Sequence, residues 1–191
     1  MPIVSTIKMT ARQFLQLGED PPGVRLELVD GEVAVGPSPV PKHSFVVVQI
    51  VFILEGHNQA HDLGELHQDV DTILDTFTVR RPDVLFFFHD RTHLIGDKAM
   101  EGPPDLAVEV VSPSSVEVDR TDKFAEYRRA GVRFYWIIDP ELRTMDAWEL
   151  KRGRYVRAGR GQGVDVVRLP PFPDLDLPLE RLWRRATPGR I

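Results

Sequence analysis

The sequence predicts an α/β protein whose mixed β-sheet is flanked by helices and preceded by a hairpin near the N-terminus. Residues 84–88 and 106–111 are short apolar runs bounded by Pro, Gly and charged residues, which is typical of interior strands in a covered sheet. Residues 106–138 read as strand, helix and strand in turn. An Asp30-Gly31 pair between two apolar runs indicates the hairpin. The order of these elements indicates a mixed sheet.

The N-terminal part of the chain contains two predicted helices around the hairpin. Thr10 and Gln13 have the Thr-x-x-Gln form of a capping box, so a short helix is expected to begin there and to end at Gly18. The hairpin pairs residues 25–29 with residues 33–35, because Asp-Gly supplies the positive φ angles of a tight turn. Residues 45–54 are apolar at nearly every position, and their length favours a helix over a strand.

The rest of the chain alternates between strands and one further helix. Residues 55–78 carry six acidic residues and no Lys or Arg, and we expect one strand and turns there. A helix is predicted for residues 119–130, with Asp119 and Asp122 as candidate caps and Gly131 as its stop. The remaining predicted elements are a strand at 132–138 and short strands at 144–150 and 155–156, with a turn at Gly153.

Length and composition limit the classes of protein. The 191 residues fit one domain, residues 1–191, with a Pro- and Arg-rich tail from about residue 170 that is expected to lie irregularly on the surface. Hydrophobic and charged contents of 42% and 28% are those of a globular protein. The absence of cysteine excludes disulfides, thiolate metal sites and cysteine nucleophiles, and it fits a reducing cytoplasm.

Charge and hydropathy limit the partners. The formal net charge is −5, so the chain as a whole lacks the basic character of many nucleic-acid-binding domains. The N-terminus lacks a secretory signal pattern, and the longest apolar run, residues 45–54, is far shorter than the roughly 18–20 residues of a membrane span. We therefore expect a cytoplasmic protein without a membrane partner.

Two carboxylates interrupt the predicted interior strands. Asp83 opens the run 84–88, and Glu109 lies in the middle of the run 106–111. A buried ionised carboxylate needs a cation, a metal ion or several hydrogen-bond donors, because burial of the charge alone is costly. No charged residue shares the strand face of Glu109, so its partner is expected from elsewhere in the fold. The alternative is structural: Asp83 caps a turn, and Glu109 pairs with a framework arginine.

Lys123 is the third candidate. In a helix, Lys123 lies within about 20–40° of Tyr127 and Ala130, at the edge of the face that packs on the sheet. A lysine at that edge reaches a buried carboxylate. The alternative is a flanking lysine whose stem lies along the core while its ammonium group stays in water.

Several motifs occur in an order that resembles one known family. They are Arg81-Pro82-Asp83-Val84, residues 104–113 (PDLAVEVVSP), Asp119, Lys123, Tyr127, residues 130–132 (AGV) and residues 135–140 (YWIIDP), with residues 26–31 (LELVDG) and His43 upstream. This pattern resembles the Uma-type restriction endonuclease family of the PD-(D/E)XK nuclease superfamily. The similarity covers most of the chain.

The resemblance implies a restriction-endonuclease-like core with a divalent metal site. Asp83 and Glu109 correspond to the motif residues that hold Mg²⁺ or Mn²⁺, and the backbone carbonyl of Val110 beside Glu109 is a further candidate ligand. Hard oxygen ligands of this kind suit these cations. The superfamily pattern has a lysine two residues after the acidic residue, where this chain has Val111. We therefore expect Lys123 to take over the role of helping to activate the attacking water.

Four residues are weaker candidates, each with a plain alternative. Glu27 is a further metal ligand or a solvent-facing strand residue. His43 contacts a phosphate group of the substrate, or it is a capping or surface histidine. Ser112 contacts a phosphate group or begins a turn. Asp119 tethers Lys123 or, as we expect, caps its helix.

The expected activity is metal-dependent endonucleolytic hydrolysis of DNA. The alternatives are a nuclease-like module that has lost catalysis and binds DNA or another protein, and a hydrolase acting on small nucleotides. Basic residues concentrate at 120–133 and 181–190, where they contact DNA phosphates or form an ordinary solvated surface. Nucleases of this fold are often dimers, so a homodimer is a further expectation.

Overall fold

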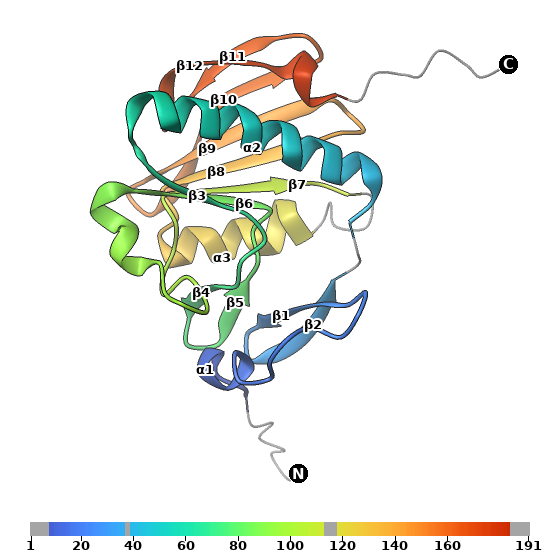
Figure 1. The fold of residues 1–191 in the computed structure, drawn as a ribbon, viewed down its shortest axis with the longest axis vertical. Coiled ribbons are helices and arrows are strands. Elements are labelled where there is room, and N and C mark those ends of the chain that lie inside the picture. Colours follow the sequence, from blue (N-terminus) through green and yellow to red (C-terminus); the bar gives the residue numbers. More distant parts are fainter. Residues whose placement is uncertain (1–7, 37–38, 113–117, 184–191) are drawn as a thin grey trace, which may run out of the picture.

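Three β-sheets and two main helices make up the described part of the protein (Figure 1). The computed structural model describes residues 8–36, 39–112 and 118–183. The largest sheet has six strands in the order β10-β9-β8-β7-β6-β3, and only β7 and β8 run parallel within it. Its strands are β3 (Gly64–His67), β6 (Val84–Phe88), β7 (Leu106–Val110), β8 (Phe134–Asp139), β9 (Thr144–Lys151) and β10 (Arg154–Gln162). The predicted mixed sheet and its interior strands β6 and β7 are confirmed.

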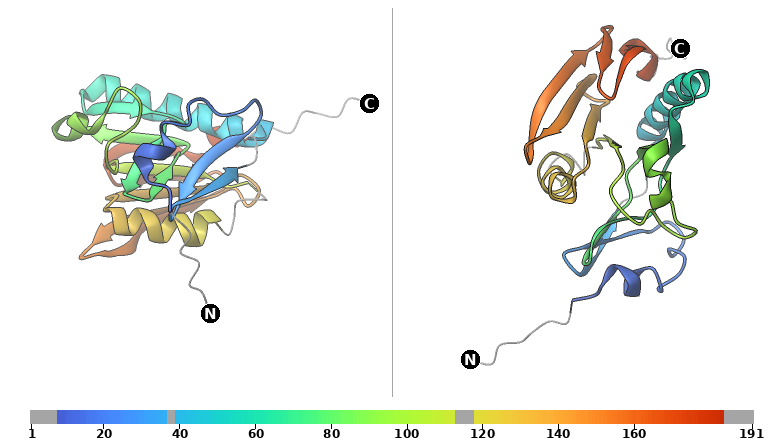
Figure 2. Two further views of the ribbon diagram at one scale, coloured as in Figure 1. Left: turned by 90° about the horizontal axis from the view of Figure 1, so that it is seen from below. Right: turned by 90° about the vertical axis from the view of Figure 1, so that its left-hand side faces the viewer.

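The two main helices lie on opposite faces of this sheet, as Figure 2 shows in its left-hand view. α2 (Pro41–His61) covers one face, and α3 (Lys123–Ala130) covers the other. Because side chains alternate along a strand, each strand contributes to two separate cores. Val84 and Val108 belong to the core under α2, whereas Ala107 packs with Tyr127 on the α3 side.

A second sheet of four antiparallel strands lies beyond one edge of this core, in the order β2-β1-β5-β4. The strands are β1 (Arg25–Val29), β2 (Glu32–Gly36), β4 (Thr72–Asp75) and β5 (Thr78–Arg80). The predicted hairpin is confirmed, because Asp30 and Gly31 form its turn with φ angles of 49° and 82°. The predicted capping box of Thr10 and Gln13 is also confirmed, and it begins α1 (Ala11–Phe14). This helix ends before Gly18, which lies in the following turn with positive φ.

Two predicted segments differ in extent from the structure. The apolar helix is longer than residues 45–54, since α2 continues through polar residues to His61. Residues 55–78 contain the end of α2, the strands β3 and β4 and the start of β5, rather than one strand and turns. Their acidic residues hid these strands, because strands at the edges of sheets leave many side chains in water. After β6, a 3₁₀ segment (His89–Leu94) follows.

The helix predicted for residues 119–130 begins differently. A π-helical turn (Val118–Asp122) precedes α3, and Asp122 makes no side-chain capping hydrogen bond. The predicted stop at Gly131 is confirmed, with a φ of 88° at the C-cap. The π-helical turn is important below because its residues face the polar side of the large sheet.

The C-terminal part is more regular than predicted. β11 (Val166–Leu169) and β12 (Phe172–Pro178) form a hairpin, and a 3₁₀ turn (Leu179–Leu182) follows. Leu177, Leu179 and Leu182 are buried in the core under α2. The prediction of an irregular surface tail is therefore wrong for these residues, while residues 184–191 lie outside the described part. Among helices of the described residues, none is long and apolar enough to cross a membrane.

Candidate active site

Asp83 lies where the chain passes from the small sheet to the large one. β5 ends at Arg80, and β6 begins at Val84. β6 pairs antiparallel with β7, with Val84 opposite Val108, so Asp83 is brought beside Glu109. The Asp83 Oδ2 atom accepts a hydrogen bond of 2.7 Å from the Val110 backbone N–H. The two candidate carboxylates therefore lie side by side, on adjacent strands.

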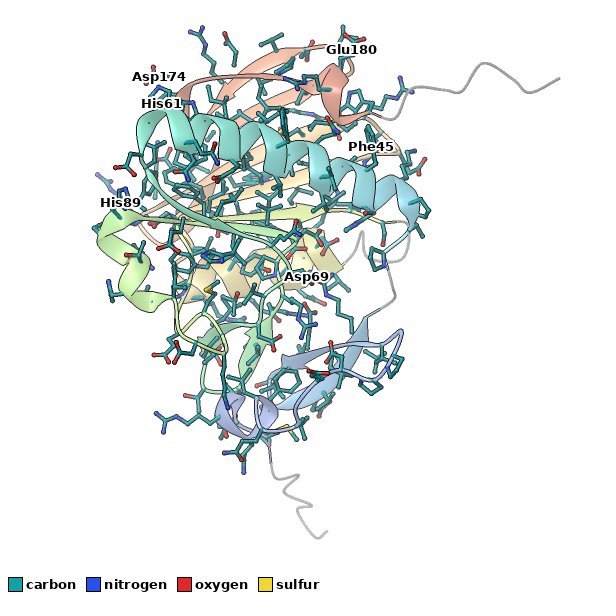
Figure 3. The ribbon with its side chains drawn as sticks, viewed as in Figure 1. Phe45, His61, Asp69, His89, Asp174 and Glu180 are labelled. Carbon is teal, nitrogen blue, oxygen red and sulfur yellow. The ribbon has the colours of Figure 1, made fainter. Side chains whose placement is uncertain are left out.

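Asp83 is buried against two cationic or proton-donating groups. His43 Nε2 lies 3.1 Å from Asp83 Oδ2, and Arg25 Nη1 lies 3.6 Å from Asp83 Oδ1. Burial alone would raise the pKa of Asp83, but the hydrogen bond and charge interaction with His43 hold it below its usual value. Arg25 also pairs with Asp69, which Figure 3 shows between the large sheet and the N-terminal hairpin. His43 is thus neither a cap nor a surface residue. Its position near the start of α2 places it beside the Asp83 carboxylate.

Glu109 is 2% exposed and is contacted by two side chains of α3. The hydroxyl of Tyr127 donates a hydrogen bond of 2.6 Å to Oε1, and Lys123 Nζ lies 2.9 Å from Oε2. Burial raises the pKa of Glu109 to about 8, with Asp83 and Asp119 adding to the effect and Lys123 opposing it. The cation that sequence reasoning required for Glu109 is Lys123, from outside its strand.

Lys123 joins several carboxylates. Besides Glu109, its Nζ atom lies 3.3 Å from Asp119 Oδ1 and 4.0 Å from Glu27 Oε1. Burial alone would lower the pKa of Lys123, but Glu109 and the neighbouring carboxylates raise it, so the ammonium form persists. Asp119 is therefore a tether of Lys123, and the expectation that it acts only as a helix cap is wrong. Its place in the π-helical turn, one turn before Lys123, explains the contact.

Glu27 is largely shielded from solvent rather than solvent-facing, with 12% of its side chain exposed. Its Oε2 atom accepts a hydrogen bond of 2.9 Å from Arg80 Nη1, and its Oε1 atom accepts one from the Arg81 backbone N–H. Arg80 also holds Glu126 of α3 through two hydrogen bonds, of 2.6 and 2.9 Å. Charge interactions with Lys123 and Arg80 lower the pKa of Glu27, against the effect of burial. This buried network fixes α3, and with it Lys123, relative to the small sheet.

A cavity of about 680 Å³ opens onto these groups. Val110, Ser112 and His43 line it, together with Asp83, Glu109 and Lys123. Six carboxylates from the described residues line this cavity against three Arg and Lys side chains: Glu27, Glu32, Asp83, Glu109, Asp119 and Asp122 against Arg25, Arg80 and Lys123. The cavity therefore has an excess of negative charge.

The donor set fits a hard divalent cation, although it is not arranged as a complete protein cage. Among the described residues, no group of three or more His, Asp and Glu side chains has the geometry of a metal site. Mg²⁺ commonly takes only one or two protein carboxylates and completes its shell with water and substrate oxygens. Asp83 and Glu109 supply two such carboxylates, and an excess of acid in a buried site favours a cation.

Some contacts within this cluster could not be predicted from local sequence patterns. Arg80 and Glu126 are 46 residues apart, and their pairing depends on how α3 docks. Tyr127 was visible as part of a motif and as a helical neighbour of Lys123, but its hydrogen bond to Glu109 required the register of α3 on β7. A polar residue predicted on the sheet-facing side of a helix is the signal that could have identified Glu126.

Comparison with known proteins relates this site to a family. The family model described as "Uma2: Putative restriction endonuclease" matches residues 11–180. The chain belongs to the Uma2 family. The resemblance inferred from the ordered motifs is thereby confirmed. Among proteins of curated function, none matches the chain.

A solved structure shares the fold of this Uma2 protein. It is described as the crystal structure of "a putative nuclease belonging to DUF820" from Anabaena variabilis ATCC 29413, at 20% sequence identity. The match has a TM-score of 0.75 and covers 92% of this chain and 97% of that chain. At this identity the likeness shows the fold alone, and the predicted nuclease-like α/β core is confirmed.

Val111 and Lys123 differ from the superfamily pattern: Val111 is apolar, and Lys123 contacts the motif carboxylate. Val111 is buried in the apolar core between the sheet and α3. The ammonium group in contact with Glu109 belongs to Lys123 of α3.

Proposed function

We propose that this protein is a metal-dependent DNA endonuclease whose site consists of Asp83, Glu109 and Lys123. The observation that carries the proposal is the cluster itself: two buried carboxylates on adjacent strands, with one lysine in contact, at an acid-rich cavity. Membership of the Uma2 family supports the same reaction class. Buried ionisable groups with strongly perturbed pKa values are typical of functional sites.

Mg²⁺ or Mn²⁺ would be held by the Asp83 and Glu109 carboxylates and by the Val110 backbone carbonyl. Such a cation would neutralise charge on the scissile phosphate and lower the pKa of the attacking water. The excess of carboxylates supports this assignment, since one lysine cannot neutralise Glu109, Asp119 and Glu27 together. Glu27 remains a weaker candidate ligand, because Arg80 and the Arg81 N–H already occupy its oxygens.

The chain's own groups perform the remaining tasks. Lys123 orients the attacking water and stabilises the charge that develops on the phosphate. Tyr127 positions Glu109 by its hydrogen bond, and His43 positions Asp83. His43 and Ser112 also line the cavity, where they are candidates to contact a substrate phosphate.

Cleavage of supercoiled plasmid DNA tests the proposal. The parent protein is incubated with Mg²⁺, with Mn²⁺ and with EDTA, alongside an Asp83→Asn, Glu109→Gln double variant. We expect nicked and linear products with either cation, none with EDTA, and none from the double variant. Asp176→Asn is the control, because Asp176 is an exposed carboxylate that pairs with Arg168 and does not line the cavity.

The alternative function, a nuclease-like module that binds without cutting, makes the opposite prediction. It is supported if the parent leaves the plasmid intact under all conditions and calorimetry detects no heat when Mn²⁺ is added. Cleavage by the double variant at the parent rate would instead show that the activity comes from another site or from a contaminant.

A further inference from the structure

A row of residues crosses the large sheet from Glu109 to its edge strand. Glu109 on β7 is opposite Ile137 on β8, Ile137 is opposite Asp146 on β9, and Asp146 is opposite Arg160 on β10. Residues opposite one another in a sheet project from the same face. Arg160 therefore projects on the α3 side, three strands from Glu109. With strands about 4.8 Å apart, this separation is roughly 14 Å.

A β-bulge brings a second arginine to that face. The register of β10 on β9 shifts between Arg157 and Gly159, so Ala158 has no opposite residue. Without the bulge, Arg157 and Arg160 would project from opposite faces, because they are three residues apart. With it, both project on the α3 side. Arg157 also lies over the ring of Trp148, its cross-strand neighbour, at 5.0 Å from the ring centroid, which restricts its side chain.

Both arginines lie near one buried carboxylate, that of Asp146, but neither donates a hydrogen bond to it. Asp146 is 6% exposed, and its Oδ1 atom lies 3.6 Å from Arg157 Nε and 3.8 Å from Arg160 Nε. These distances exceed those of hydrogen bonds. Among the described residues, no donor makes a hydrogen bond to Asp146 Oδ1. The Arg157 and Arg160 side chains are 52% and 50% exposed, so their N–H groups remain accessible.

A third arginine makes the cluster net positive and connects it to the candidate active site. Arg120 Nη1 lies 3.8 Å from Asp146 Oδ2, and Arg120 Nη2 lies 3.3 Å from Asp139 Oδ2. Three guanidinium groups thus face two carboxylates. Arg120 follows Asp119, the tether of Lys123, in the same π-helical turn. The arginine cluster and the catalytic cluster therefore flank one turn of the chain.

We propose that Arg157 and Arg160 form a binding site for backbone phosphates of the DNA substrate, next to the cleavage site. Guanidinium groups bind phosphate through paired N–H donors, and the two arginines present such donors on one exposed face. Asp146 and Trp148 hold them in place rather than saturating them. One DNA strand carries a phosphate about every 3.4 Å of helix axis, so a separation of roughly 14 Å spans about four phosphates. The assignment of DNA as the ligand rests on the proposed function.

Binding of DNA without cleavage tests this site. Fluorescence anisotropy of a labelled 25-base-pair duplex is measured in EDTA over a series of NaCl concentrations, for the parent, Arg157→Gln, Arg160→Gln and the double variant. Each single substitution is expected to weaken binding about tenfold, because it removes charge-assisted hydrogen bonds to a phosphate. Each should also reduce the slope of log K against log[NaCl] by about one. Arg168→Gln, which removes an exposed arginine of β11, should change neither quantity.

A further variant serves as a control for effects of the substitutions on folding. Loss of both arginines leaves Asp146 with fewer cations, so the measurement is repeated in an Asp146→Asn background, which removes the carboxylate itself. A double variant with the affinity and salt slope of the parent would overturn the proposal and assign the arginines to neutralisation of Asp146 alone. A parent that does not bind the duplex would overturn it as well. Because no cleavage is required, arginine-dependent binding would support this site even if the plasmid assay found no nuclease activity.

Discussion

The two faces of the large sheet differ in what they bury. Under α2, the buried side chains from the sheet are apolar, with Val84, Val108 and Trp136 among them. On the α3 side, the same strands bury Glu109 and Asp146 beside an apolar cluster. Strand alternation alone separates these environments, because successive residues point to opposite faces. One face mainly stabilises the fold, and the other holds charged groups that burial makes costly.

This difference teaches where stability and function are located. A buried charge costs free energy unless it is paired, so an acid-rich cluster lowers the stability that the same volume of apolar side chains would give. The α3 face retains such a cluster and compensates it with Lys123, Arg80 and the Tyr127 hydroxyl. Substitutions on the two faces should therefore have opposite patterns of effect.

Glu109→Gln should have the largest effect, and mainly on activity. We expect the rate of plasmid cleavage to fall by at least about 10²–10³-fold, the order found when a transition-state interaction is removed. The free energy of unfolding should change little by comparison, because glutamine keeps the shape of the side chain and Lys123 keeps Asp119 and Glu27 as carboxylate partners. Cleavage kinetics and urea unfolding measure the two quantities. Parent-like cleavage by this variant would contradict the assignment.

Arg80→Met should cost stability on the polar face. The substitution leaves Glu27 and Glu126 buried without their guanidinium partner, and breaking a buried ion pair in this way typically costs about 3–5 kcal/mol. Urea unfolding measures the loss. If adding Glu126→Gln restores stability, part of the loss is due to the unpaired carboxylate of Glu126. A single variant as stable as the parent would show that the network contributes nothing.

Ile50→Ala should cost stability on the apolar face without affecting chemistry. Ile50 is fully buried under α2, and truncation of such a side chain costs about 2–5 kcal/mol. The rate of cleavage, measured well below the unfolding midpoint, should stay close to that of the parent because Ile50 does not line the cavity. A large loss of cleavage in a folded variant would contradict the separation of the two faces.

Tyr127→Phe should have the smallest effect, and it should change both the rate of cleavage and the free energy of unfolding. Removal of the hydroxyl takes one donor from Glu109 and should lower the free energy of unfolding by about 1–3 kcal/mol. If Tyr127 positions Glu109, kcat should fall while KM for DNA stays unchanged, since Tyr127 is fully buried and does not line the cavity. A change confined to stability would make Tyr127 a structural residue only.

The sequence predicted what depends on local patterns. The hairpin turn at Asp30-Gly31, the capping box at Thr10 and the helix stop at Gly131 each follow from neighbouring residues, and each is confirmed. The apolar helix was underestimated because the apolar run 45–54 shows no periodicity and the last two turns of α2, residues 55–61, are mostly polar. Contacts between residues far apart in the sequence could not be predicted from local patterns. His43 and Asp83, for example, are 40 residues apart.

A Mn²⁺ complex tests the central claim most directly. Crystals of the parent protein are soaked with Mn²⁺, and anomalous diffraction is recorded near the manganese edge. We predict a peak within bonding distance of carboxylate oxygens of both Asp83 and Glu109 and of the Val110 carbonyl oxygen, as expected of a cation that prefers hard oxygen ligands. A saturating soak that leaves this position without a peak, while Lys123 remains in contact with Glu109, would contradict the account.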